Sequence, residues 1–240
     1  MTDPESPRRP ERAADLPAER LGKRHGSLSK VVADELRRGI LTGRRKAGDR
    51  LVEDRLSAEL GVSRVPIREA LRLLASEGLV EVQPRRGASV AEFSADVARD
   101  LVEVRAMLEG LNARLAARHR APAIIAELRQ VLTDGNTAAQ SGSVADLVRL
   151  NGEFHDKLAE AGRNSILWDI MRTLRERTSL VFAANTAGRS REDWDEHSRI
   201  LAAVIEGDEE LSALLATRHV HQAAEAAFAA QAAVEPQAQA

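Results

Sequence analysis

Residues 61–74 read GVSRVPIREALRLL, and this stretch decides how the first part of the chain folds. Gly61 ends a short run with helical periodicity, and Ser63 is a residue type that caps the start of a new helix. Pro66 falls in the first turn of that helix, where its missing N–H is not needed. Apolar residues then recur at helical spacing from Ile67 to Leu74. The stretch therefore predicts two helices joined by a tight turn.

The flanking residues complete a winged helix-turn-helix. Upstream, apolar side chains recur at helical spacing and stop before Gly43. Downstream, two short β segments at 79–83 and 88–90 flank a PRRG turn. Three helices and a β-hairpin wing within residues 27–93 predict a DNA-binding domain of this class.

The rest of the chain predicts an all-helical bundle over residues 94–231. Residues 96–119 carry apolar side chains in alternating steps of four and three, which predicts a long amphipathic helix. These residues are Val97, Leu101, Val104, Leu108, Leu111 and Leu115. Further helices are predicted at about 122–140, 143–161, 164–185, 191–206 and 208–231, with breaks at Gly142, Gly162, Gly188 and Gly207. The fold class is therefore mainly α, with a winged helix-turn-helix before a helical bundle.

Composition bounds the function. The chain has 240 residues, 43% of them hydrophobic and 30% charged, and no cysteine, which excludes disulfides, thiolate zinc sites and cysteine catalysis. No run approaches the roughly 20 apolar residues of a membrane span, and the N-terminus lacks a secretory signal, so a cytoplasmic protein with no membrane partner is expected. Residues 1–26 are predicted to be a disordered arm and residues 232–240 a frayed tail.

Charge is unevenly divided between the two predicted domains. Residues 27–93 carry 13 Lys/Arg against 10 Asp/Glu, whereas residues 94–240 carry 16 against 22. A basic front and an acidic back indicate different partners. Aromatic residues are only 2% of the chain, which argues against stacking on single-stranded nucleic acid.

Arginines mark the surface that is predicted to read DNA. Arg64, Arg68 and Arg72 share the polar face of the helix that begins near Ser63. The wing carries Arg85 and Arg86 beside Gly87, where the backbone can approach a groove. Free N–H groups at a helix start can bind phosphate, and arginine can bind guanine edges. The alternative is a solvated face on which these arginines pair with Glu69 and Glu77.

The run from residue 29 to 90 resembles the GntR family of bacterial transcription factors. The similarity lies in ILTGRRKAGDRLVE, LGVSRVPIREALRLLASEGLV and PRRGASV. The resemblance implies a double-stranded DNA operator, read by the second helix of the pair in the major groove. It also implies operator contacts from five residues: Ser63, Arg64, Arg68, Arg86 and Gly87. Half-site recognition calls for two-fold symmetry, so a homodimer on a palindromic operator is expected.

Three histidines lie on apolar stripes of three predicted helices. His155 follows Asn151 by four residues and shares its helix face, while His197 and His219 belong to stripes farther along the chain. Imidazole is the commonest transition-metal ligand, so the three could converge on a metal. A single such histidine is more often a hydrogen-bonded core residue. His221 is expected at the surface, because it faces away from the stripe of His219.

Residues from about 93 to 228 resemble the FCD effector-binding domain of the FadR subgroup of GntR regulators. The similarity lies in LVEVR at 101–105, the Asn151 to His155 segment, GRN at 162–164, the Glu196–His197 pair and the late His219. It implies that Asn151, His155, His197 and His219 hold a divalent metal, commonly zinc or nickel. It also implies that Arg105 binds the carboxylate of an organic-acid effector.

Asn151 stands where many relatives have Asp, and an amide oxygen is a poorer ligand for a transition metal than a carboxylate. When filled with metal, a site with this neutral ligand carries one more positive charge than a site with Asp. That extra charge favours an anionic effector. The alternative role for Arg105 is an ion pair with Glu109 one turn later.

Together these features predict a metabolite-responsive transcriptional regulator, with repression as the expected mode. One rival is a metal-dependent enzyme, in which three histidines and an oxygen ligand activate water. Metal-dependent turnover of the effector would favour it. The other rival is an architectural DNA binder with no effector, whose operator binding would be indifferent to metabolites.

Overall fold

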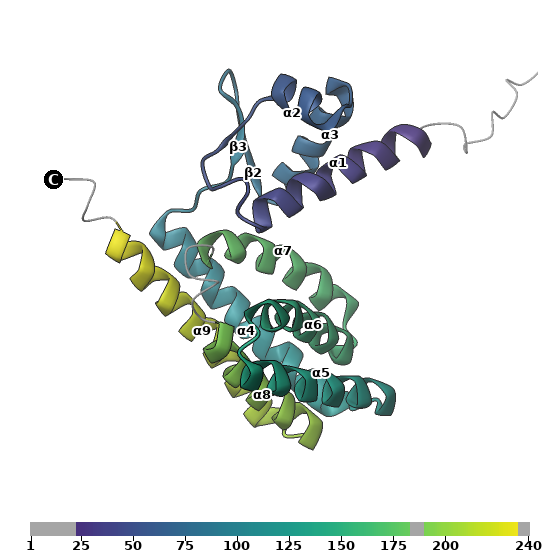
Figure 1. The fold of residues 1–240 in the computed structure, drawn as a ribbon, viewed down its shortest axis with the longest axis vertical. Helices are drawn as coiled ribbons and strands as arrows, with labels where there is room; N and C mark the ends of the chain where they lie inside the picture. The colour runs from purple at the N-terminus through teal and green to yellow at the C-terminus, as the bar shows by residue number, and fades with distance from the viewer. Residues whose placement is uncertain (1–22, 183–189, 235–240) are drawn as a thin grey trace, which may run out of the picture.

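The structure of the protein is a computed structural model that describes residues 23–182 and 190–234, and Figure 1 shows them as two units. The N-terminal unit consists of α1 Lys23–Leu41, β1 Arg50–Leu51, α2 Glu53–Leu60, α3 Arg64–Ser76, β2 Val80–Gln83 and β3 Gly87–Val90. The bundle consists of α4 Ala95–His119, α5 Pro122–Ser141, α6 Val144–Gly162, α7 Ser165–Phe182, α8 Ser190–Glu206 and α9 Glu209–Val234.

The N-terminal unit has its own apolar core between α1, α3 and the sheet. Leu36 of α1, Ile67 and Leu74 of α3, and Leu79 are all fully buried in it. Gly61 ends α2 in the left-handed region at φ 65°, and this residue turns the chain from α2 toward α3. Ser63 occupies the N-cap position as predicted, but its side chain makes no capping hydrogen bond.

The wing is an antiparallel hairpin with a third strand at its edge. β2 and β3 pair from Val80↔Val90 to Gln83↔Gly87, and the tip uses left-handed backbone at Arg85 and Gly87. β1 pairs with the other edge of β3, so the strand order is β1-β3-β2. This strand has only two residues, too few for a periodic pattern, and the sequence did not predict it.

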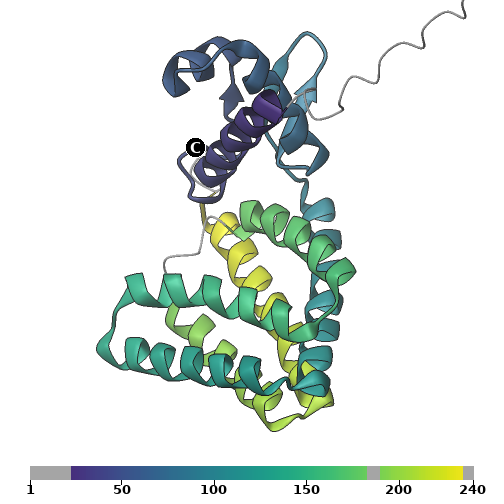
Figure 2. The ribbon, with the colours of Figure 1, turned by 90° about the vertical axis from the view of Figure 1, so that its right-hand side faces the viewer.

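In the bundle, α4 and α9 pack side by side, and α5, α6 and α8 pack together next to them (Figures 1 and 2). The core joins these helices through large buried side chains, among them Leu128, Phe154, Leu158 and Trp194. Trp194 packs closely over Gly135 of α5, whose missing side chain leaves room for the indole ring.

The apolar stripe predicted for the long helix faces the core only in part, with Leu101 buried and Leu108 and Leu115 half-buried. Val104 and Leu111 are 51% and 43% exposed, whereas the neighbouring face of α4 is buried. Besides Leu101 and Val102, that buried face carries mostly small and polar residues: Ala98, Arg105, Ala106, Glu109, Gly110, Asn112, Ala113, Ala116 and Ala117. Small residues occupy this face because they let α9 approach closely. A Cβ on Gly110 would lie only 2.4 Å from Thr217 Oγ1.

Helix ends differ from the expected ones by a few residues. α1 begins at Lys23 rather than at residue 27, and α9 continues to Val234 rather than ending at 231. The rest of the predicted arm (1–22), the break at Gly188 and the end of the tail lie outside the described residues. None of the helices within the described ranges is both long enough and apolar enough to cross a membrane.

Candidate functional site

Two arginines of α3, Arg64 and Arg68, lie on the surface, each against an acidic side chain of α2. Arg68 donates two hydrogen bonds to Glu53, from Nε to Oε1 at 3.0 Å and from Nη2 to Oε2 at 2.8 Å. Arg64 pairs with Asp54. The expected alternative partners are engaged elsewhere, since Glu69 accepts from Ser29 and Glu77 pairs with Arg37 of α1.

The wing and the recognition helix border a common hollow of about 490 Å³. Its lining includes Glu53, Arg68 and Arg72 from the helix pair, and Arg86 and Gly87 from the wing. Ser63, Arg64, Arg68, Arg86 and Gly87 are all exposed. The structure thus places every residue of the predicted operator set on the accessible surface of the N-terminal unit.

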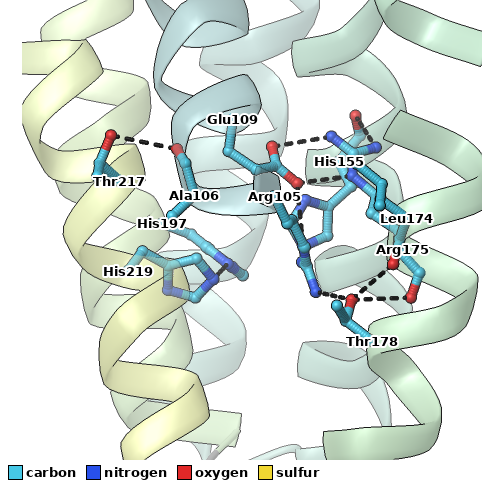
Figure 3. Close-up of polar contacts among 10 residues, drawn as sticks. All are labelled: Arg105, Ala106, Glu109, His155, Leu174, Arg175, Thr178, His197, Thr217 and His219. Atoms are coloured by element: carbon cyan, nitrogen blue, oxygen red, sulfur yellow. Dashed lines mark hydrogen bonds and ion pairs between the residues drawn. The ribbon is translucent and has the colours of Figure 1, made fainter. Parts of the chain in front are cut away.

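Three of the four predicted metal ligands converge inside the bundle. His155 of α6, His197 of α8 and His219 of α9, here called the histidine cluster, have ligand nitrogens within 4.8 Å of one another. His197 and His219 face each other through their Nε2 atoms at 3.0 Å (Figure 3). Asn151 lies one turn before His155 and is half-buried, and its role as the fourth ligand stays a prediction.

The surroundings keep His155 and His197 uncharged and orient the rings of the cluster. Burial lowers the pKa values of His155 and His197 well below their usual range, and nearby positive charges act in the same direction. Phe154 stacks on the ring of His197 with centroids 4.0 Å apart. His219 Nδ1 lies 2.6 Å from Glu196 Oε2, a carboxylate–imidazole contact of the kind that fixes the tautomer of a ligating histidine.

Arg105 is buried beside the cluster, as the sequence led us to expect. It is 7% exposed and donates from Nη1 to Thr178 Oγ1 of α7 at 2.6 Å. Its Nε lies 3.5 Å from Glu109 Oε1 and has no hydrogen-bond partner among the described residues. The ion pair with Glu109 is therefore present but weakly formed.

Glu109 is held instead by Arg175 of α7. Arg175 donates from Nε and Nη2 to the two carboxylate oxygens at 2.7 and 3.0 Å (Figure 3). Burial alone would raise the pKa of Glu109, but the charges of Arg175 and Arg105 outweigh it and lower the pKa to about 2. Around Arg105, two guanidinium groups and one carboxylate thus leave one excess positive charge, and Glu196 adds a second carboxylate at His219.

Sequence reasoning missed Arg175, Thr178 and the pairing role of Glu53. Arg175 and Thr178 reach the site from a helix about 70 residues away in the chain, and only the fold brings them to Arg105. The acidic residues 53 and 54 precede the recognition helix without any spacing rule that links them to Arg68. Glu196 carried a signal, because it directly precedes His197.

α7 connects this site to the N-terminal unit. Glu176, the residue after Arg175, lies 3.4 Å from Arg37 of α1, and Leu180 packs against the core of the N-terminal unit. Figure 2 shows α7 at the end of the bundle that faces that unit. α7 therefore contacts both the N-terminal unit, which carries the candidate DNA-binding residues, and the buried site beside the histidine cluster.

Two parts of the chain match described domain families. Residues 28–90 match the bacterial regulatory proteins of the gntR family, and residues 100–222 match the FCD domain. The Nta operon transcriptional regulator of Aminobacter aminovorans is 30% identical over 178 residues, which cover 74% of this chain and 83% of that protein. The gluconate operon transcriptional repressor of Bacillus licheniformis is 27% identical over 170 residues, which cover 71% and 70%.

The fold is also similar to a solved structure, that of McbR/YncC from E. coli. The two superpose with a TM-score of 0.71 at 24% sequence identity, covering 84% of this chain and 97% of the other. At this identity the likeness establishes a shared arrangement of helices and wing.

Proposed function

The chain belongs to the gntR family of bacterial regulatory proteins and is a DNA-binding transcriptional regulator with an FCD domain, and from that premise we propose that it binds a palindromic operator as a homodimer and senses a small organic acid at a metal-containing pocket. Regulators, not enzymes, carry these two domains, so the metalloenzyme alternative is set aside.

The convergence of the histidine cluster carries the proposal. Three imidazoles from three helices meet with their ligand nitrogens within 4.8 Å of one another, and FCD domains bind metal in some members of the family. The Nδ1 atoms of His155 and His197 are buried without a hydrogen-bond partner among the described residues, which is costly unless something else engages those rings. The donor set fits a zinc or nickel ion held by His155, His197 and His219, with Asn151 as the oxygen donor.

The excess charge supports an anionic effector. Arg105 and Arg175 outnumber Glu109 beside the histidine cluster, and a divalent ion with neutral ligands would add two positive charges against the one negative charge of Glu196. Arg105 is the proposed anchor, because its guanidinium matches a carboxylate in shape and keeps unused donor capacity at Nε. The metal would supply a second contact for an oxygen of the same small acid.

The homodimer is supported by an apolar patch on the outside of the bundle. α4 and α9 pack together and carry large exposed apolar side chains, which we call the α4–α9 patch: Val104, Met107, Leu111, Leu211 and Leu214. Large exposed apolar side chains gathered on two packed helices are typical of an interaction site. A second copy burying it would bring two winged units onto one operator, as a palindromic site requires.

A thermal-shift screen of short-chain carboxylates, with and without Zn²⁺ or Ni²⁺, tests the sensing role. A ligand that binds the native state raises the unfolding temperature. We expect at least one carboxylate to raise that temperature only when the metal is present. That carboxylate should then change operator affinity in a titration at fixed salt. Operator binding that ignores every carboxylate that binds the protein would favour an architectural DNA binder.

A further inference from the structure

The carboxylate of Glu53 accepts two hydrogen bonds from one edge of the Arg68 guanidinium group, a contact called the grip below. Glu53 is the first residue of α2, and Arg68 lies in the second turn of α3. The two hydrogen bonds use Nε and Nη2, which together form the lateral edge of the guanidinium group. A guanidinium has five N–H donors in a fixed plane, so this grip leaves the terminal edge, formed by Nη1 and the second hydrogen of Nη2.

We infer that Glu53 is a positioning residue for sequence reading, which holds Arg68 so that its terminal edge is presented to a guanine. This inference rests on the proposed DNA-reading role of Arg68. A guanine offers two acceptors side by side in the major groove, O6 and N7, and a terminal guanidinium edge supplies two parallel donors. Holding the long side chain in advance reduces the rotamer freedom that is lost on binding.

The same carboxylate opposes general attraction to DNA. Glu53 lies on the basic face, where hydrogen bonding from Arg68 lowers its pKa and the charges of Arg68, Arg64 and Arg72 act in the same direction. A negative charge at this place repels phosphates, which provide most of the affinity for DNA of any sequence. Glu53 therefore has two opposite effects: it weakens general binding and sharpens the reading of one base pair.

The neighbouring residue provides a matched control. Asp54 carries the same charge on the same helix, but its ion pair is with Arg64, whose Nε lies 2.5 Å from Asp54 Oδ1. Both of those side chains are more than 60% exposed. Removing the charge of Asp54 changes the general electrostatics as removing that of Glu53 does, but it leaves the two-bond grip on Arg68 intact.

The test compares Glu53→Gln, Asp54→Asn and Arg68→Ala on DNA duplexes selected by the wild-type protein from a randomised library. Each operator position is then substituted, and affinities are measured at one salt concentration. A glutamine amide can accept only one of the two hydrogen bonds, so its grip is incomplete. Arg68→Ala identifies the base pair that Arg68 reads. We expect Glu53→Gln to reduce discrimination at that base pair by about three- to tenfold, part of the loss from removing a whole bidentate contact.

General affinity moves in the opposite direction. Both Glu53→Gln and Asp54→Asn should bind an unrelated duplex about twofold more tightly, because each removes one negative charge near the phosphates. Only Glu53→Gln should relax the Arg68 position, and it should have no further effect there when combined with Arg68→Ala. Unchanged thermal unfolding of both variants confirms that these surface changes leave the fold intact.

Each contrary result has a distinct meaning. If Arg68→Ala relaxes one base pair and Glu53→Gln leaves its discrimination unchanged, the positioning role is refuted while Arg68 remains a reading residue. Equal relaxation by Glu53→Gln and Asp54→Asn would assign the effect to charge alone and also refute it. If Arg68→Ala relaxes no position, the proposed reading role of Arg68 itself fails.

Discussion

Replacing Gly135 with alanine should destabilise the bundle, although alanine is the better helix former. An added Cβ would lie 1.8 Å from Cζ2 and 2.1 Å from Cη2 of Trp194, well inside van der Waals contact. The ring is 2% exposed and is tied to Asn136 by a hydrogen bond from Nε1 to Oδ1 at 3.0 Å. It therefore cannot move aside without disturbing the core and losing that bond.

The size of the effect follows from three terms. Overpacking a core costs about 1–3 kcal/mol, and the strained indole hydrogen bond costs about 1 kcal/mol more. Alanine recovers about 1 kcal/mol of helix propensity relative to glycine. The free energy of unfolding should fall by about 2 kcal/mol, which for a chain of this length lowers the unfolding midpoint by roughly 4–8 °C.

The measurement is thermal unfolding followed by the circular dichroism of the helices, with Gly152→Ala as the matched control. Gly152 lies within α6, and among the described residues an added Cβ there would meet nothing within 4 Å besides its chain neighbours and the backbone of its own helix. The same substitution should therefore raise the midpoint by roughly 2–4 °C. Trp194 lies one turn before His197 on α8, so Gly135→Ala should also weaken the stabilisation by added Zn²⁺. A Gly135→Ala midpoint equal to or above that of Gly152→Ala would refute the packing described for Trp194.

Alanine in place of any member of the histidine cluster should lower the bound metal measured by elemental analysis, whereas His221→Ala, at a partly exposed position, should not; equal losses from both would contradict the assigned ligands. Arg105→Lys should leave effector-free operator affinity nearly unchanged and blunt the effector response, because lysine lacks the planar fork; a mutant that responds at wild-type effector concentrations would remove Arg105 as the anchor. Met107→Glu places a charge in the α4–α9 patch and should shift sedimentation toward the monomer, while Gln140→Glu on α5 should not; a Met107→Glu dimer as stable as wild type would place the interface elsewhere.

The elements that sequence reasoning located are those with local signals. The helix pair around Gly61 follows from a left-handed turn residue between two periodic runs, and the wing follows from a short turn between two β segments. The convergence of His155, His197 and His219 followed from apolar stripes, because each histidine replaces a core residue on its own helix.

What sequence reasoning missed depends on partners far along the chain. The stripe of α4 predicted the buried face only in part, because close packing of α9 on small residues outweighs the hydrophobicity of Val104 and Leu111, which stay exposed. Asn112 can be buried there because Leu158, 46 residues later, accepts a hydrogen bond from its side chain. Likewise, the local spacing of Arg105 and Glu109 suggested a mutual ion pair, but Arg175 holds the carboxylate more closely.

Through the neighbouring residues Arg175 and Glu176, α7 contacts both the buried site of the bundle and the N-terminal unit. One grips the buried carboxylate beside the histidines, and the other lies against an arginine of the DNA-reading unit. Consecutive helical residues are fixed at about 100° to each other, so a rotation of α7 that changes one contact changes the other. Coupling between two binding sites is reciprocal. If an effector changes the affinity for the operator through α7, then the operator must change the affinity for that effector by the same factor.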